Sequence, residues 1–253
     1  MKIHLGDISV FKYFIEALKV VNEEQTLTFT ENGIGAMTMD PSHVAMVKAE
    51  MKKTEGFTLE DFAKEETTVC LNIAEVHKVV DRLEKKEKVE IEYDEESNKF
   101  VILATRSGQT RRFSLYVMEP LDEELPEPKI NFTHSARIAG DAINQAMKDA
   151  GLWSEHVAFK GEKEAMTVSN SGDMGDFQVK WKPSSEDMLE WEAEDDDEAS
   201  ATYTLSYLQS IIGVAKKDAE VFKLSWTNDM PIKIEVEHPT IEIEYYLAPC
   251  IGV

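Results

Sequence analysis

The spacing of apolar residues along the chain predicts four helices among many short strands. Residues 8–21 place Phe11, Phe14, Ile15 and Leu18 on one helical face, because positions three and four apart share a face of an α-helix. Similar spacing predicts helices over 72–84, 135–150 and 203–215. Alternating or short apolar runs predict strands over 26–30, 35–39, 44–51, 89–93, 100–103, 111–117, 157–159, 165–168, 177–181, 188–192, 221–226, 232–236 and 241–247. This mixture indicates an α+β protein.

Two stretches of the chain repeat each other at an offset of 132 residues. Apolar residues coincide at Ile73/Leu205, Val76/Leu208, Val79/Ile211, Val80/Ile212, Val89/Val221 and Phe100/Ile232, while Ile91 lies one step from the position of Leu224. A second echo, at an offset near 130, pairs 27–30 and 36–39 with 157–160 and 165–168 and needs a slip of one residue. We therefore predict two copies of one unit, each with two helices and hairpin-linked strands.

The border between the two copies is an acidic, proline-rich segment. Residues 118–130 contain Pro120, Pro126 and Pro128. Prolines cannot donate to a strand ladder and they restrict the residues before them. We expect an extended linker at 118–130, an N-terminal domain at 1–117 and a C-terminal domain at 131–253.

Composition indicates a globular, strongly acidic protein. The chain has 253 residues, 42% apolar content and a net charge of −22, so an evenly spread charge would repel DNA. The first residues lack the apolar run of a signal peptide, and no stretch approaches the roughly 18 to 20 apolar residues of a membrane span. We expect an intracellular protein without a membrane partner. Cys70 and Cys250 have no metal-type spacing, and no disulfide is expected.

An enzymatic interpretation finds little support. The carboxylates of 194–198 suggest a cation site, but five consecutive acids cannot all face one ion, and a solvated loop is the stronger interpretation. The glycines of 169–175 lie between predicted strands and indicate a turn. We expect no catalytic residues, no metal and no cofactor.

Five segments carry a resemblance to a known family. They are 39–47 (MDPSHVAMV), 124–128 (ELPEP), 207–208 (YL), 229–234 (DMPIKI) and 245–249 (YYLAP). In this order on a duplicated unit, they resemble the DNA sliding clamps of the proliferating cell nuclear antigen family, with archaeal members the most similar in length. The resemblance covers essentially the whole chain. It implies the α+β DNA clamp fold, with two similar domains that each pack two helices on antiparallel sheet, and a head-to-tail trimeric ring.

The same resemblance implies a processivity factor for DNA replication and DNA repair. Helices of such clamps line a hole that encircles double-stranded DNA without reading its sequence, so a net charge of −22 is compatible with retention by topology. The residues expected to face DNA are Lys12, Lys19, Lys78, Arg82, Arg137, Lys148, Lys216 and Lys217.

Ring closure in the family pairs an edge strand of one subunit with an edge strand of the next. The matching strands here are 111–117 and 177–181, whose apolar members would be buried on pairing. The expected subunit interface residues are Phe113, Leu115, Phe177, Val179 and Trp181.

The family also implies a groove that binds short peptide motifs of partner enzymes. DNA polymerase, clamp loader, flap endonuclease and DNA ligase are the partners implied. The acidic segment 122–124 would attract basic residues beside such motifs. The groove wall is expected to comprise Met39, His43, Val44, Leu125, Pro231, Tyr246, Leu247, Ala248 and Pro249.

Two alternatives remain open at this stage. The first is that the chain is one of several different subunits of a heterotrimeric clamp, and the second is that it is an acidic scaffold that binds peptides without encircling DNA. Subunits of homotrimers and heterotrimers share one fold, and a scaffold would share the groove.

Overall fold

Two units make up the chain, whose computed structural model describes residues 1–60, 66–120, 125–194 and 198–252. Unit 1 comprises 1–40, 47–125 and 239–242, and unit 2 comprises 41–46, 126–238 and 243–253. The change from unit 1 to unit 2 at 125/126 falls inside the segment expected to be a linker.

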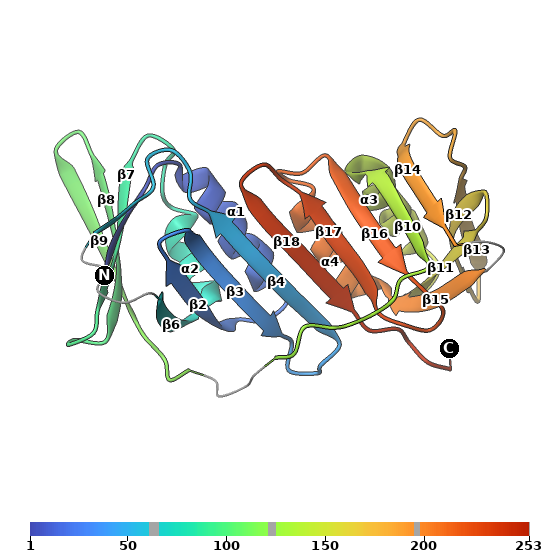
Figure 1. Cartoon of the computed structure of the whole chain (residues 1–253), viewed down its shortest axis with the longest axis horizontal. Coiled ribbons are helices and arrows are strands. Elements are labelled where there is room, and N and C mark those ends of the chain that lie inside the picture. Colours follow the sequence, from blue (N-terminus) through green and yellow to red (C-terminus); the bar gives the residue numbers. More distant parts are fainter. Residues whose placement is uncertain (61–65, 121–124, 195–197, 253) are drawn as a thin grey trace. The chain divides into compact units, whose positions relative to one another are not determined.

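Unit 1 contains two groups of strands and two helices (Figure 1). The first group has the order β5-β1-β7-β8-β9, with bounds Thr58–Glu60, Lys2–Leu5, Lys88–Asp94, Lys99–Arg106 and Gln109–Tyr116. The second has the order β4-β3-β2-β6, with bounds Ala45–Lys52, Gly33–Met39, Glu24–Thr30 and Glu66–Asn72. Helix α1 is Ile8–Lys19 and helix α2 is Ile73–Val80. Strand β9 ends its group and is an edge strand.

Unit 2 repeats this plan. Its first group has the order β14-β10-β16-β17-β18, with bounds Met188–Ala193, His134–Ala139, Val221–Trp226, Ile232–Glu237 and Ile241–Leu247. Its second has the order β13-β12-β11-β15, with bounds Gly175–Trp181, Ala165–Gly172, His156–Glu162 and Ala199–Thr204. Helix α3 is Gly140–Ala150 and helix α4 is Leu205–Ala215. Strand β13 is the edge strand of the second group.

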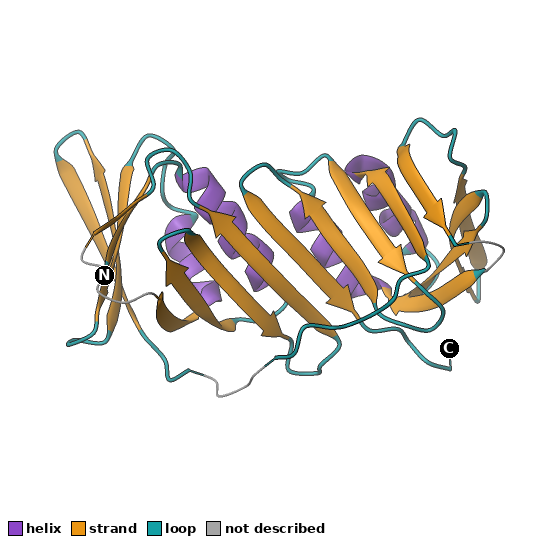
Figure 2. Cartoon of the chain, viewed as in Figure 1, coloured by secondary structure: helices purple, strands orange, loops and turns teal. Residues whose placement is uncertain are grey.

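The two helices of each unit lie beside each other against the strands (Figure 2). In unit 1, Asp7 accepts a hydrogen bond from Ser9 N at 2.8 Å, and Asn72 accepts one from Glu75 N at 3.0 Å. These N-caps satisfy backbone donors that a helix start leaves free. The apolar faces of all four helices are buried, including Phe11, Phe14 and Leu18 of α1. The prediction of an α+β fold with two helices per repeated unit is confirmed.

The repeat extends further than the sequence comparison found. The β2–β3 hairpin pairs Thr30 with Gly33, and the β11–β12 hairpin pairs Glu162 with Ala165, so these hairpins also match at an offset of 132. The expected offset near 130 is wrong for them. Strand β16 is shifted by one instead: Phe222 and Leu224 are buried there, whereas Val221 is only half-buried.

Several strands were missed or misassigned. The helix expected over 135–150 begins only at Gly140, because 134–139 forms β10, whose Ala136 and Ile138 alternate toward the core. The pattern did not predict β1, β5, β6 or β15. Strands β6 and β15 run directly into α2 and α4, so no loop composition separates strand from helix there.

Candidate functional site

Both strands expected at the subunit contact lie at sheet edges, as predicted from the sequence. Their side chains alternate between half-buried and exposed positions, and an edge strand presents unpaired backbone groups to a partner. The expected interface residues Phe113, Leu115, Phe177 and Val179 are half-buried, and Trp181 is buried at 6% exposure. Pairing of these strands with another chain stays a prediction.

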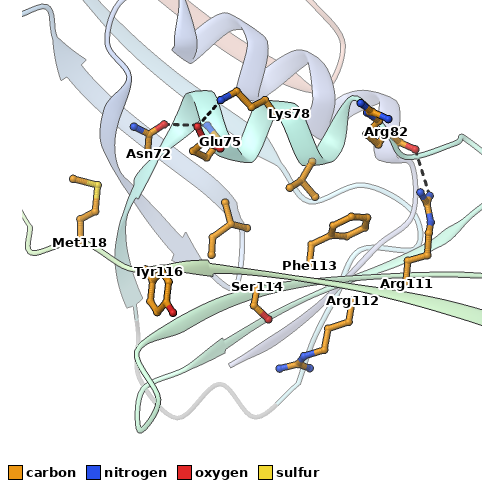
Figure 3. A pocket seen from close by; sticks show the side chains of 12 residues that line it. Asn72, Glu75, Lys78, Arg82, Arg111, Arg112, Phe113, Ser114, Tyr116 and Met118 are labelled. Carbon is orange, nitrogen blue, oxygen red and sulfur yellow. Dashed lines mark hydrogen bonds and ion pairs between the residues drawn. The ribbon is translucent and has the colours of Figure 1, made fainter.

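A cavity of about 950 Å³ lies beside β9 in unit 1. Its apolar lining comes from Val79 of α2, from Phe113 and Leu115 of β9, and from Met118. Figure 3 shows the Phe113 ring pointing toward α2, on the opposite side of β9 from Arg112. The cavity is thus a space between a helix and an edge strand.

The rim of this cavity is basic. It includes Lys78, Arg82 and Arg111. Arg111 donates both to Glu87, at 2.6 Å and 2.7 Å, and to the Arg82 carbonyl oxygen at 3.3 Å. The Glu84 backbone N–H and then Arg111 lower the pKa of Glu87 below its usual value, so Glu87 holds Arg111 in place as a carboxylate.

The end of α3 exposes a short apolar segment next to the other edge strand. Leu152 is 73% exposed and Trp153 is 39% exposed. The Trp153 ring lies against Gly175, the first residue of β13: a Cβ there would lie 2.4 Å from Trp153 Cζ3. Glycine at this position therefore allows the indole to pack onto the start of the strand.

The basic residues expected to face DNA from unit 1 lie on its helices or, for Arg82, just after α2. Lys12 of α1 donates to the carbonyl oxygens of Asp81 at 3.3 Å and Leu83 at 2.6 Å, so its ammonium group holds the chain just beyond α2. Lys19 is exposed with its Nζ 3.4 Å from His77 Nδ1, and exposed Lys78 pairs with Glu75 at 2.5 Å. Exposed Arg82 follows α2.

The expected DNA-facing residues of unit 2 differ from those of unit 1 in their ion pairs and in the elements that carry them. Lys148 on α3 and Lys217 beyond α4 are exposed, and Lys216 pairs with Asp141. Arg137 lies on β10, between the inward-facing Ala136 and Ile138, and pairs with Glu190 and Glu237. Its side chain therefore extends from the face of β10 opposite the helix-covered core, and its placement on a helix lining is wrong.

The expected peptide groove combines residues of both units. Met39 and Leu125 belong to unit 1, and the other wall residues belong to unit 2. In unit 2, Ala248 N donates to Val44 O at 2.8 Å, which holds the C-terminal segment beside the loop that contains exposed His43. Half-buried Pro231, Ala248 and Pro249 present surface. Leu247 is 0% exposed, so it belongs to the core instead of the surface of a wall.

Tyr246 is nearly buried among charges. Its hydroxyl lies 3.0 Å from Glu244, and Lys233 Nζ lies 5.8 Å from its ring centroid. Burial and the Glu244 carboxylate raise the pKa of Tyr246 to about 12. The groove as a binding site stays a prediction, and its acidic segment 122–124 lies outside the described residues.

The acidic cluster of 194–198 is described only at its ends, because residues 195–197 lie outside the described residues. Among the residues that the structure describes, no three His, Cys, Asp or Glu side chains are grouped as metal ligands. In the same part of the chain, no helix combines the length and apolar character needed to cross a membrane.

Comparisons with known proteins agree over both units. The model of the N-terminal domain of proliferating cell nuclear antigen matches residues 1–124. A DNA polymerase sliding clamp of Methanococcus maripaludis is 30% identical over 251 residues, which cover 95% of each protein. The chain belongs to the DNA polymerase sliding clamp family. Solved clamps share the fold: proliferating cell nuclear antigen of Thermococcus kodakaraensis has a TM-score of 0.88 at 19% identity, covering 98% of this chain and 99% of its own.

A second solved sliding clamp was determined with a bound peptide. The structure of the C-terminal region of FEN-1 bound to A. fulgidus proliferating cell nuclear antigen matches with a TM-score of 0.85 at 19% identity and covers all of both chains. The sequence analysis did not predict that α2 forms a wall of the cavity or that Leu152 and Trp153 are exposed. In the sequence, only the internal repeat could have indicated these features, because it allows equivalent positions of the two units to be compared.

Proposed function

We propose that this protein is a sliding clamp subunit that encircles duplex DNA and tethers DNA polymerase and other replication and repair enzymes. The observation that carries this proposal is the 30% identity to a DNA polymerase sliding clamp across 251 residues, which spans both repeated units. Shared fold alone would not carry it, because one fold hosts many functions. A clamp that works on the chromosome is intracellular, and in an archaeal cell it works at the nucleoid in the cytoplasm.

Retention by enclosure explains how so acidic a chain works on DNA. With a net charge of −22, the electrostatic interaction between the whole protein and DNA phosphates is repulsive on average. A closed ring does not need that attraction, and a lining with only a few cations avoids holding the ring at one site. Pairing of Lys78 with Glu75 and of Lys216 with Asp141 further weakens the positive charge. A closed ring with a weakly positive lining would be retained on DNA and still move along it.

Tethering requires no chemistry from the clamp itself. A partner such as a polymerase, flap endonuclease, ligase or clamp loader docks a short motif, and a tethered enzyme acts at a high effective concentration on the enclosed DNA. The half-buried residues Pro231, Ala248 and Pro249 supply surface for such a motif in unit 2. The protein is proposed to be a non-enzymatic platform.

Encirclement is tested by loading the protein with a clamp loader onto nicked circular DNA and onto the same DNA after linearisation. We expect the protein to stay on the circle through gel filtration at high salt and to slide off the linear form, because a closed circle has no end. Loss from both forms at the same rate would refute encirclement and favour the scaffold alternative.

The peptide groove is tested separately with a matched pair of substitutions. Ala248→Glu places a charge at a half-buried wall position, whereas Ile251→Glu places the same charge at a position that is 87% exposed. We expect Ala248→Glu alone to weaken binding of a flap endonuclease C-terminal peptide by about tenfold or more, since anchors in small interfaces contribute at least this much. Equal effects of the two changes would remove Ala248 from the groove.

A further inference from the structure

Edge strand β5 buries little apolar surface of its own. It spans three residues, Thr58–Glu60, and pairs antiparallel with β1. Thr58 and Glu60 are exposed, and Leu59 is half-buried. Short segments with few buried apolar contacts belong to the least stable parts of a fold. Polar contacts between β5 and its sheet therefore weigh heavily in its attachment.

The loop before β5 is packed firmly. Phe57 is buried, and its backbone N–H donates to Thr54 O at 3.0 Å. A Cβ on Gly6 would lie 2.1 Å from Glu55 O, so this loop lies directly against the turn between β1 and α1. Opening of β5 would therefore pivot about the loop and would not require unit 1 to unfold.

His4 of β1 lies between carboxylates of the two neighbouring strands. Ile3 and Leu5 are buried, so His4 extends from the opposite face of β1, where it is half-buried. Its Nε2 lies 3.4 Å from Glu60 Oε1 of β5, and its Nδ1 lies 3.4 Å from Glu90 Oε1 of β7. The imidazole thus bridges the edge strand and the interior of the sheet.

His4 belongs to a row of alternating charges on this face of the sheet. Lys2 lies 2.9 Å from Glu90 and 3.4 Å from Glu92, and Arg112 of β9 lies 3.8 Å from Glu92. In order, the members of the row are Glu60, His4, Glu90, Lys2, Glu92 and Arg112. Carboxylates and basic groups are equal in number, so the charges of the row balance when His4 is an imidazolium.

The protonation state of His4 decides whether both of its contacts are favourable. Both ring nitrogens of an imidazolium donate, so each meets its carboxylate as a donor. In neutral imidazole one nitrogen carries a lone pair, which repels the carboxylate oxygen that it faces. Histidine is the side chain that ordinarily changes charge between about pH 5 and 8, whereas carboxylates and ammonium groups keep theirs. The charged groups that face His4 are of these two kinds: Glu60 from β5, Glu90 from β7 and Lys2 from β1, with exposed Lys88 two residues before Glu90.

We propose that His4 is a pH-sensitive latch, which holds β5 on the sheet while it is protonated and releases the strand as the pH rises. Release exposes the backbone groups of β1 that pair with β5, and such groups can pair with another strand. Below about pH 4.5 the carboxylates take up protons, so attachment is greatest at about pH 5 to 6. The latch lies within unit 1 and does not depend on the proposed clamp function.

Hydrogen exchange of the Thr58–Glu60 amides, divided by the intrinsic rate at each pH, measures the opening of β5. In the wild-type chain we expect their protection to fall by about threefold or more between about pH 5.5 and 8, as two partly exposed ion pairs are lost. Amides of the interior strand β8 serve as the internal reference and should show no such fall. His4→Gln should give low protection at both pH values. His4→Lys keeps a cation at this position and should restore protection at the higher pH.

Glu60→Gln tests the contact with β5 itself. It should lower protection at about pH 5.5 toward the level of His4→Gln, and the double variant should add little, because the two residues act through one contact. His156→Gln in β11 of unit 2 is the matched control. It removes a histidine without changing this sheet, so its pH dependence should equal that of the wild-type chain.

Two outcomes would overturn the proposal. One is the same pH dependence in His4→Gln as in the wild-type chain, which would assign the effect to another group. The other is protection of the Thr58–Glu60 amides that does not change with pH in the wild-type chain. Either result leaves retention on circular DNA, and with it the proposed clamp function, unaffected.

Discussion

The helix pairs of the two units share an apolar frame and differ in charge. Apolar positions agree at Phe11/Ile143, Phe14/Ala146 and Leu18/Ala150, all buried. Lys12, Lys19 and Lys78 lie on the helices of unit 1. Helix α4 has no charged residue between Leu205 and Ala215, and α3 offsets Lys148 with Asp141 and Asp149. Core packing accounts for the apolar positions that the two units share, whereas the charged positions of the helices differ between the units.

The largest difference that can be tested lies at one core position. In unit 1 the side chain at this position fills the core, and in unit 2 the position is a glycine against which a neighbouring side chain packs. Phe29 of β2 is buried and lies 6.2 Å from the Phe100 ring. Its equivalent in unit 2 is Gly161, where a Cβ would lie 2.3 Å from His134 Cδ2. We expect Phe29→Ala to lower the free energy of unfolding by about 3 to 5 kcal/mol through a cavity, and Gly161→Ala by about 1 to 3 kcal/mol through overpacking.

Urea unfolding can assign each loss to its unit. All four tryptophans lie in unit 2, so tryptophan fluorescence reports unit 2 and far-ultraviolet circular dichroism reports both. Phe29→Ala should shift mainly the dichroism transition and Gly161→Ala the fluorescence transition. Gly35→Ala is the control, because the nearest atom to its new Cβ is Ala49 O at 3.9 Å. Equal losses at Gly35 and Gly161 would contradict the role of the His134 ring.

The next difference concerns Lys12, whose side chain stabilises the backbone that follows α2. Lys12 Nζ donates to the Asp81 and Leu83 carbonyl oxygens, whereas its equivalent in α3 is the buried Asn144. Lys12→Met keeps the length of the side chain and removes both bonds. We expect a loss of about 1 to 2 kcal/mol in the free energy of unfolding, as for a partly buried bond with a charged donor. Lys148→Met, at an exposed position, should change it by less than about 0.5 kcal/mol, and an equal effect would refute the structural role of Lys12.

The repeat shows what the sequence could and could not predict. It was visible at α2 and α4 because both helices keep apolar residues at the same spacing with no insertion. The hairpins were aligned wrongly because equivalent positions carry side chains of different size. At an offset of 132, Leu27 corresponds to Phe159 and Phe29 corresponds to Gly161, so neither position looks repeated in the sequence. The prediction of a helix over 135–139 failed because Ile138, Ala142 and Ile143 fit helical spacing, although Ala136 and Ile138 also fit a strand.

The candidate sites likewise include features that could be predicted from the sequence and features that could not. The edge strands could be predicted because family resemblance places them in the sequence. That Arg137 extends from the face of β10 away from the helix-covered core depends on strand alternation, which the helix prediction concealed. The cavity beside β9 could not be predicted, because it depends on residues 72–82 and 111–118 coming together in the folded unit.

A smaller difference is sensitive to pH. Glu87 has a side chain that is 6% exposed, and its pKa is lowered first by the Glu84 backbone N–H and then by Arg111. The position equivalent to Arg111 is the buried Ile243, so unit 2 has no such pair there. A lowered pKa means that the folded state favours the carboxylate. The resulting stability is present above the ordinary value near 4.5 and is lost as the pH falls below it.

Glu87→Gln should remove this contribution. We expect a loss of under about 1 kcal/mol at neutral pH, since Arg111 is partly exposed, and a flatter dependence of the urea midpoint between pH 3 and 7. Glu84→Gln, at an exposed carboxylate that pairs with Arg106, should alter that dependence less. The prediction fails if Glu87→Gln leaves the acid limb of the profile unchanged.

The smallest effect expected concerns DNA and returns to the charge of the helices. If the helices line the ring, Lys19 and Lys78 of unit 1 contribute more to phosphate contact than Lys148 and Lys217 of unit 2, because an aspartate directly follows each of the latter, Asp149 and Asp218. Replacing the first pair by alanine should make the slope of log affinity against log salt shallower by about 1 to 2 for a short linear duplex, and replacing the second by less than about 1. Retention on circular DNA should survive both changes, because enclosure does not depend on these cations. A larger effect of the second pair would show that the divergence of the helix faces has no bearing on DNA contact.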